Sequence, residues 1–326
     1  MARFIIRRVL WAIPVLFISS VIVFVTIRAT TNPIAAAARN PHTTPAALAK
    51  YKHDIGFDKS EPQQYWIWLT HFLRGDFGSS LHSQGLAVWP LLRTALVNSL
   101  VLGLIATALA IFIGVIIGII SAIKQYSAFD HGATGLAFFG LSLPTFWFCL
   151  ILIVLFGVFY ESHTGHSSPL LPSSGIYSPG SVGFHLGDRA KHLILPILAL
   201  MVQIVAVYSR YMRTSMLEVI NSDYMRTARS KGISEKRVII RHAVRNALIP
   251  IATFTALDVG AIASGLIVTE QLFQYPGMGV YFLNAWSNGD YPLILPWVMI
   301  TVMFVIICNL LADISYAVLD PRIRLD

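Results

Sequence analysis

The sequence predicts an all-α integral membrane protein with about six transmembrane helices. Hydrophobic residues make up 56% of the 326 residues and charged residues only 12%, whereas a soluble domain usually carries about 25% charged residues. Several apolar runs also reach the roughly 20 residues that a helix needs to cross a bilayer. Because so little charge cannot cover a water-exposed surface, one membrane helix bundle accounts for most of the chain.

The first apolar run follows directly after three basic residues. Arg3, Arg7 and Arg8 precede the run 9–27, and four alanines at 35–38 resemble a cleavage region. A secretory signal peptide has this order of charge, apolar core and small residues. The run is longer than the about 7–15 residues of a typical signal core, so we expect it to remain as the first span.

The apolar runs define six expected spans. They lie near residues 9–29, 95–121, 133–160, 193–213, 247–269 and 293–318. In the second span, Gly114 and Gly118 have the small-xxx-small spacing that lets two helices approach closely. Prolines within or at the ends of spans remove helical hydrogen bonds and are expected to produce static bends: Pro14, Pro144, Pro196, Pro250 and Pro296.

Loop charges predict an orientation with both termini in the cytoplasm. Basic residues favour the cytoplasmic side of a membrane, and long loops count less in this rule. With the N-terminus inside, the inner segments hold 15 of the 24 Lys and Arg residues: Arg3, Arg7, Arg8, Lys124, Arg322, Arg324 and the nine from Arg210 to Arg245. This clustering at the ends of apolar runs is an orientation signal, and it argues against nucleic acid as a partner.

Two outer segments differ in character. Segment 30–94 is rich in aromatic residues, which disordered loops lack, so we expect a small ordered extracytoplasmic subdomain with helices near 45–54 and 62–74. Segment 161–192 is rich in Ser, Pro and Gly and is expected to be an irregular loop.

The inner stretch 221–250 carries the most specific pattern. Asn221, Ser222 or Asp223 can cap the start of a short helix, Gly232 suits the left-handed residue that ends it, and Ser234 can cap a second helix. The pattern predicts a short helix across the membrane surface, joined by a turn to the fifth span.

The short helix has a face suited to docking. Tyr224 and Ala228 fall four residues apart, and Arg226, Arg229 and Lys231 surround them. Ala and Gly would let another protein's surface come close. An amphipathic helix bound to anionic lipid explains the same spacing, and spacing alone leaves both interpretations open.

This stretch resembles the inner-loop "EAA" motif of permease subunits of binding-protein-dependent ABC importers. Thr227 and Ala228 occupy the Ala-Ala place, Gly232 the glycine and Pro250 the downstream proline. Arg226 stands where the motif has glutamate, which puts in doubt any ion pair that a glutamate would make with the ATPase.

The resemblance extends over nearly the whole chain, to the B subunits of dipeptide, oligopeptide and nickel permeases, and is greatest for the dipeptide branch. The stretches that carry it are DIGFDKSEPQQYWIWL (54–69), RGDFGSSL (74–81), LSLPTFW (141–147), LLPSSG (170–175), VTEQLFQYPGMGVYFLNAWSNGDYPLI (268–294) and LDPRIR (319–324).

The resemblance implies a type I ABC importer (MetI-like) permease fold in a prokaryotic inner membrane. It implies the first helix and tail at 1–29, an extracytoplasmic subdomain at 30–94, a five-helix core at 95–318 with a coupling loop at 219–246, and a cytoplasmic tail at 319–326. The implied partners are a second homologous permease subunit, two cytoplasmic ATPases and an outer solute-binding protein. The residues implied to couple to the ATPase are Tyr224, Arg226, Thr227, Ala228, Arg229, Lys231 and Gly232.

The chain has no Gly-x-x-x-x-Gly-Lys-Ser/Thr phosphate-binding loop. We therefore expect no enzymatic activity and no cofactor in this chain, with ATP and magnesium bound by the partner ATPases. Dipeptides or oligopeptides are the expected substrates, and nickel or glutathione-like solutes are alternatives. A secondary transporter and a membrane enzyme are further alternatives, opposed by the lack of an internal repeat and of a nucleophile elbow.

Polar residues inside spans are candidates for function because burying them is costly. Gln203, Asp258 and Glu270 are the candidate pore or gate residues. Asp258 either lines the path or is hydrogen-bonded between helices, and Glu270 is interpreted as a gate or subunit-interface residue.

No metal site is expected. The histidines at 163, 166, 185 and 192 lie in or next to a Ser/Gly-rich loop, and such spacing does not define a ligand set. Cys149 and Cys308 both lie inside apolar runs and are interpreted as small buried residues.

Overall fold

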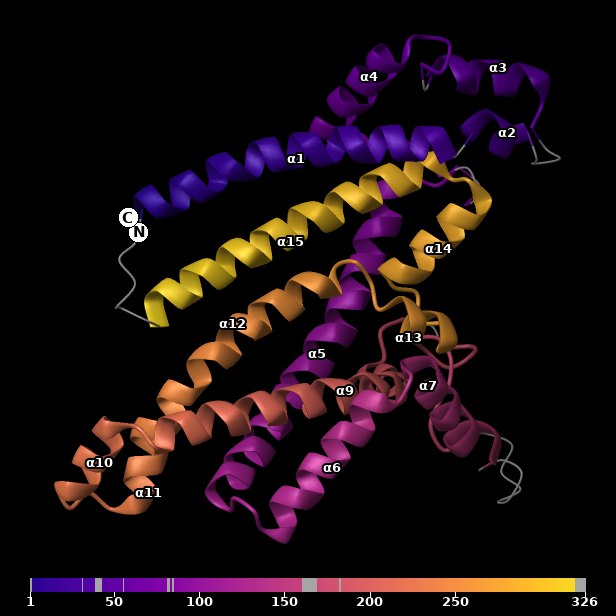
Figure 1. The fold of residues 1–326 in the computed structure, drawn as a ribbon. Helices are drawn as coiled ribbons and strands as arrows, with labels where there is room; N and C mark the ends of the chain where they lie inside the picture. The colour runs from indigo at the N-terminus through magenta and orange to yellow at the C-terminus, as the bar shows by residue number, and fades with distance from the viewer. Residues whose placement is uncertain are drawn as a thin grey trace. The chain divides into compact units, whose positions relative to one another are not determined.

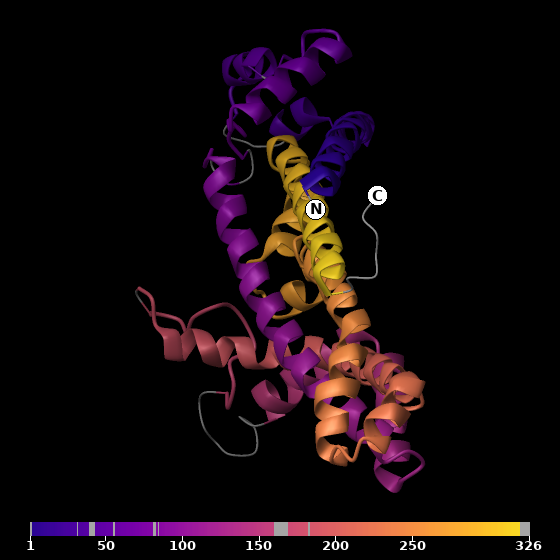
Figure 2. The same ribbon diagram turned by 90° about the vertical axis from the view of Figure 1, so that its left-hand side faces the viewer.

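The computed structural model describes residues 2–30, 32–38, 43–54, 56–80, 83, 85–159, 169–181 and 183–319. Within this part of the chain the secondary structure is helical, and β structure is limited to one isolated bridge between Ser79 and Ala87. Figure 1 labels the helices, and Figure 2 gives the same ribbon turned by 90°. The chain divides into two compact units, which are described separately below.

The first unit comprises Met1–Ser99, Ala263–Ile267 and Pro276–Ile307. Its helices are α1 (Ala2–Thr30), α2 (Pro33–Ala38), α3 (Pro45–Asp54), α4 (Glu61–Leu73), the start of α5 (Val88–Ile123), α14 (Met278–Asn288) and most of α15 (Tyr291–Leu319). The helices expected near 45–54 and 62–74 are therefore present as α3 and α4.

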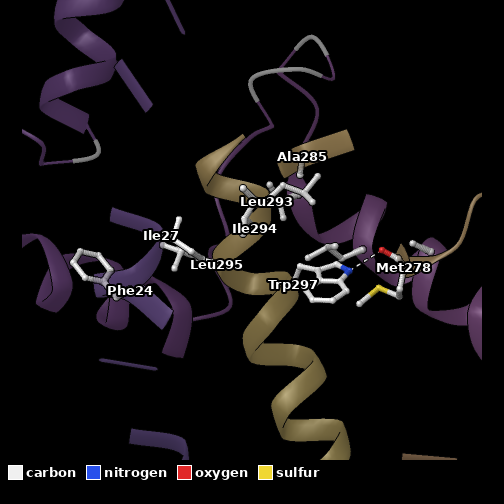
Figure 3. Close-up of a cluster of buried hydrophobic side chains, with 11 residues drawn as sticks. Phe24, Ile27, Met278, Ala285, Leu293, Ile294, Leu295 and Trp297 are labelled. Atoms are coloured by element: carbon white, nitrogen blue, oxygen red, sulfur yellow. Dashed lines mark hydrogen bonds between the residues drawn. The ribbon is translucent and has the colours of Figure 1, made fainter. Parts of the chain in front are cut away.

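A buried apolar cluster holds the first unit together. Phe24 and Ile27 of α1 pack with Leu293, Ile294 and Leu295 of α15 in the cluster drawn in Figure 3. The indole Nε1 of Trp297 donates a hydrogen bond of 2.8 Å to the carbonyl oxygen of Met278, which satisfies the polar atom of a mostly buried aromatic side chain.

Aromatic side chains connect α4 to α1. The ring centroid of Tyr65 lies 5.4 Å from that of Phe24 and 5.9 Å from that of Trp68. The ring centroids of Trp68 and Phe72 lie 5.6 Å apart, and those of Phe72 and Phe77 lie 5.3 Å apart. These contacts explain why the aromatic-rich segment after the first helix is ordered.

The second unit comprises Leu100–Ile262, Val268–Tyr275 and Cys308–Asp326. It contains the rest of α5, α6 (Ala128–Ser142), α7 (Thr145–Ile153), the π-helix η1 (Val154–Phe159), α9 (Leu186–Ile220), α10 (Asp223–Ser230), α11 (Glu235–Val238), the π-helix η2 (Ile239–Val244), α12 (Arg245–Ile262) and α13 (Ile267–Leu272). Helix α9 is central, because α6, α7 and α12 all pack against it.

Helix α5 approaches α9 closely through two glycines. A Cβ atom on Gly114 would lie 3.0 Å from Tyr208 Cβ, and one on Gly118 would lie 2.6 Å from the Ser209 carbonyl oxygen. The small-xxx-small spacing therefore does allow close helix packing, as the sequence predicts.

Four helices are long and apolar enough to cross a membrane by length and composition, among the described residues. They are Ile5–Thr30, Val88–Ile123, Leu186–Ile220 and Tyr291–Ile314. A fifth results if α6 and α7, which are bent by 96° at the break between them, form one span. The number of six spans stays a prediction.

Two of the expected spans are interrupted helices in the structure, and whether each crosses the membrane stays a prediction. The span 133–160 breaks at Leu143 and Pro144, between α6 and α7. The span 247–269 ends at Ile262, and α13 begins after a break in which Gly265 has a φ of 86°. A left-handed residue of this kind cannot continue a right-handed helix.

Candidate functional site

The segment 219–246, the expected coupling loop, folds as two short helices around a glycine turn. Ser222 is in extended conformation immediately before α10, as an N-cap residue is. Gly232 has a φ of 73°, the left-handed conformation that favours glycine. Ser234 then precedes α11. The predicted order of helix, glycine turn and second helix is confirmed, and Ser222 and Ser234 occupy the two N-cap positions, although neither side chain forms a capping hydrogen bond.

One face of α10 packs inward onto the second unit. Met225 is completely buried and Ala228 is 8% exposed. They belong to an apolar cluster that also contains Met212 and Met216 of α9 and Val238 of α11. This cluster fixes the position of α10 with respect to α9 and α11.

The expectation that Tyr224 and Ala228 lie on one docking face is wrong. Tyr224 is 44% exposed, whereas Ala228 contacts the chain's own core. A small residue at 228 therefore lets α10 lie close to its own unit. The exposed positions of the expected coupling set are Tyr224, Arg226, Thr227, Lys231 and Gly232.

Arg229 joins three parts of the loop. Its Nη2 lies 3.0 Å from Glu235 Oε1, and its Nη1 donates to the carbonyl oxygen of Ile220 at 3.4 Å. Hydrogen bonding to the Glu235 carboxylate raises the pKa of Arg229 above its usual range. Arg229 thus connects the end of α10 to the start of α11 and the end of α9.

The loop is also tied to the helices on either side of it. Ser215 Oγ of α9 donates a 3.0 Å hydrogen bond to the carbonyl oxygen of Ala247 in α12. Asn246 Nδ2 donates to the Tyr224 hydroxyl at 3.2 Å. The first bond joins α9 to α12 and the second joins α12 to α10, so with the Arg229–Ile220 contact α10 is hydrogen-bonded to both neighbouring helices.

Gln203, an expected pore or gate residue, lies at the break between α6 and α7. Its Nε2 donates to the carbonyl oxygen of Leu143 at 2.9 Å, and its Oε1 accepts from Thr145 Oγ1 at 3.2 Å. Pro144 has no backbone N–H, and a broken helix leaves carbonyl groups unpaired. Gln203 provides the missing donor, which gives it a structural role in this chain.

Asp258 of α12 accepts a hydrogen bond from the hydroxyl of Tyr208 in α9, at 2.6 Å. Tyr208 is 1% exposed, while Asp258 remains exposed. The interhelical hydrogen bond considered in the sequence analysis is therefore present. A role of Asp258 in lining the pore stays a prediction.

Glu270 of α13 is completely buried within the chain. Its backbone carbonyl accepts a 2.8 Å hydrogen bond from Tyr275 N. Its side chain is therefore not on a surface open to a second subunit, which removes the basis for the subunit-interface interpretation. A gating role stays a prediction.

An ion pair that sequence reasoning missed closes the turn between α5 and α6. Arg213 of α9 donates two hydrogen bonds of 2.7 Å to Asp130, one from Nε to Oδ1 and one from Nη2 to Oδ2. Asp130 Oδ2 also accepts from the backbone of Tyr126. The available signal was an acidic residue in the first helical turn after Ser127, which caps α6, but nothing local indicates its partner 83 residues away.

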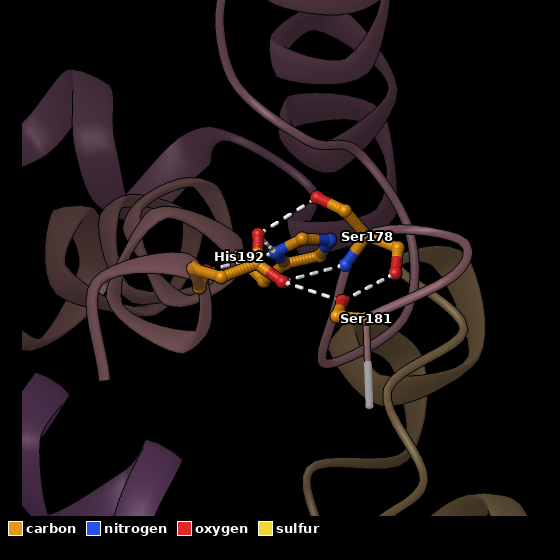
Figure 4. Close-up of polar contacts among 4 residues, drawn as sticks. Ser178, Ser181 and His192 are labelled. Atoms are coloured by element: carbon orange, nitrogen blue, oxygen red, sulfur yellow. Dashed lines mark hydrogen bonds and ion pairs between the residues drawn. The ribbon is translucent and has the colours of Figure 1, made fainter. Parts of the chain in front are cut away.

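Figure 4 shows polar contacts between Ser178 and Ser181, in the segment before α9, and residues in the first turns of α9, including His192. Ser178 Oγ and Ser181 Oγ both donate to the Asp188 carboxylate, at 2.7 and 3.2 Å, and His192 Nδ1 lies 2.9 Å from the Asp188 carbonyl oxygen. A catalytic triad requires the histidine next to the serine. Here the carboxylate contacts the serines directly, so the cluster stabilises the loop.

No group of three or more His, Cys, Asp or Glu side chains arranged to hold a metal ion occurs in the described residues. His163 and His166 lie outside them.

Comparison with known proteins places the chain in a family. A family model for binding-protein-dependent transport system inner membrane components matches residues 114–325, and the model for the N-terminal part of such components matches residues 1–116. The chain belongs to this family. It is thus a membrane-spanning component of a transport system, with the type I ABC importer permease fold expected from the sequence.

Curated relatives cover the full length of this family member. The oligopeptide transport system permease protein AppB of Bacillus subtilis is 38% identical over 324 residues, which is 99% of this chain and 100% of AppB. The dipeptide transport system permease protein DppB of Escherichia coli K12 is 35% identical over 345 residues, 99% of each chain.

A solved structure supports the fold. The inward-facing structure of the MetNI methionine ABC transporter aligns with a TM-score of 0.54 and 12% identity, over 71% of this chain and 96% of that chain. At this identity the likeness concerns the fold only.

Proposed function

We propose that this permease is one of two homologous subunits forming the pore of an ATP-driven importer of dipeptides or oligopeptides. The observation that carries the proposal is helix α10, a short helix with an exposed basic face and a buried apolar face, hydrogen-bonded to α9 and α12. The names of the relatives AppB and DppB support peptides as the substrate class.

The proposed mechanism uses α10 as the contact with a cytoplasmic ATPase. Closure of two ATPases around ATP moves the α10 helices of the two permease subunits together. Because Arg229 binds Glu235 and Ile220, α10 moves together with α11 and the end of α9. ATP drives this change only if it binds the two states with different affinity.

The proposal includes the surroundings of the chain. Both termini and the loop 219–246 lie in the cytoplasm of a prokaryotic cell, and an outer solute-binding protein delivers the peptide. Separate ATPase subunits hold ATP and magnesium, since this chain has no phosphate-binding loop.

The test is a pull-down of the tagged chain in mild detergent, followed by mass spectrometry and by uptake of a labelled dipeptide into vesicles. We expect a second permease and P-loop ATPases to co-purify, and unlabelled dipeptides to compete for uptake. A well-folded chain that binds solute but repeatedly purifies without a second permease and without ATPases would overturn the proposal. Competition by nickel or glutathione, and not by peptides, would overturn the substrate assignment alone.

A further inference from the structure

An apolar pocket of about 550 Å³ lies in the second unit, beside the end of α5. Its lining comes from three elements: Ile119 and Ile123 of α5, Lys236 of α11, and Ile239, Ile240 and Val244 of η2. The volume is within the range of about 300–1,000 Å³ typical of ligand pockets. No residue of α10 lines it, so it is distinct from the proposed contact with the ATPase.

The pocket exposes large apolar side chains. Ile240 is 58% exposed and Ile123 is 46% exposed. Removing an aliphatic side chain of this size from water is favourable by about 1.5–3 kcal/mol when burial is complete. Covering these side chains with an apolar ligand is therefore more favourable than leaving them in contact with water.

Cations adjoin the apolar lining. Lys236 lines the pocket itself, while Lys124 follows Ile123 and Arg241 follows Ile240 in the sequence. All three are exposed, and among the described residues none of them forms an ion pair. The nearby acid Glu235 is bound to Arg229, so it does not neutralise Lys236.

The location favours lipid over protein as the source of the occupant. Ile119 and Ile123 belong to the last turns of α5, one of the helices apolar enough to cross the membrane. At the end of such a helix, acyl chains give way to phosphate headgroups. Basic pockets between membrane helices on the cytoplasmic side bind anionic headgroups.

We infer that this pocket binds an anionic phospholipid, with an acyl chain against the isoleucines and the phosphate at Lys236. The bound lipid joins η2 to α5 and thereby steadies the loop 219–246. Assignment to the inner leaflet rests on the orientation proposed above, whereas binding itself does not.

The experiment is native mass spectrometry of the delipidated complex, titrated with phosphatidylglycerol or with phosphatidylcholine of identical acyl chains. The wild type is expected to bind phosphatidylglycerol more tightly. Lys236→Gln should weaken this binding about five-fold, because one cation near a lipid surface contributes about a factor of this size. Lys236→Arg should restore it.

Lys191→Gln is the matched control. Lys191 is an exposed lysine near the start of α9 and does not line the pocket. This variant should bind lipid as the wild type does. Equal binding of both lipids, or unchanged binding by Lys236→Gln, would overturn the inference. A photo-crosslinking residue at position 240 provides an independent result, since a lipid adduct supports the site and an adduct only with protein contradicts it.

Discussion

Asp130 and Arg213 form a two-pronged ion pair in which both carboxylate oxygens accept hydrogen bonds of 2.7 Å from the guanidinium group. The Asp130 side chain is 3% exposed and that of Arg213 is 26% exposed. The pair connects the turn after α5 to the part of α9 that leads into the candidate coupling loop.

Asp130→Asn should destabilise the protein, because it leaves the Arg213 guanidinium partly buried without its anion. Loss of a hydrogen bond to a charged group costs about 1.5–3 kcal/mol. Thermal unfolding in detergent measures the effect. Asp58→Asn serves as the control, because Asp58 pairs with His53 on an exposed surface, and it should leave the midpoint unchanged. Equal midpoints for both variants would contradict the assigned role of Asp130.

Gly118→Ala should loosen the contact between α5 and α9. The added Cβ would lie 2.6 Å from the carbonyl oxygen of Ser209 and 2.7 Å from Met212 Cβ, and overpacking of this kind costs about 1–3 kcal/mol. Gly132→Ala in α6 is a matched control, since its Cβ meets nothing within 4 Å. A lower unfolding temperature is expected for Gly118→Ala only.

Gln203→Leu should leave the carbonyl group of Leu143 without its donor at the break between α6 and α7. An unsatisfied acceptor costs about 1–3 kcal/mol when it is fully buried, and this site is part-buried, so the unfolding temperature should fall by no more than this cost allows. If Gln203 acts mainly in the pore, the variant would instead keep its stability and change the competition among peptides for uptake.

Substitutions at Gly232 test directly whether the turn between α10 and α11 is needed for transport. Its φ of 73° strains any residue with a side chain, although asparagine adopts this region more readily than most residues do. Gly232→Asn should therefore keep most uptake, whereas Gly232→Val should lose it while the protein still inserts. Gly232→Asp adds negative charge at the basic face and should also uncouple transport. Normal uptake by the well-expressed Val and Asp variants would remove this turn from the coupling mechanism.

Local features were predictable from the sequence where one segment contains the whole signal. Ser222, Gly232 and Ser234 mark the ends of α10 and α11, and each acts through its own backbone. The helices α3 and α4 were likewise predictable, because turn residues mark their ends and the aromatic residues of the segment indicate that it is ordered.

Features that depend on distant partners were not predictable in this way. Pro144 indicated a bend, but its 96° angle is accommodated by Gln203, about 60 residues away in the sequence. Ala228 faces inward because the methionines of α9 lie beneath it, and the periodicity of an eight-residue helix does not specify which face meets a neighbour.

The most direct test of the central claim is photo-crosslinking from position 227, where Thr227 is exposed on α10, in membranes that contain the complete transport system. We predict an adduct with a P-loop ATPase, reduced in yield when ATP binding to the ATPase is abolished, and no such adduct from position 191. Crosslinks from position 227 to lipid alone, in membranes that show ATP-driven uptake, would contradict the assignment of α10 as the coupling helix.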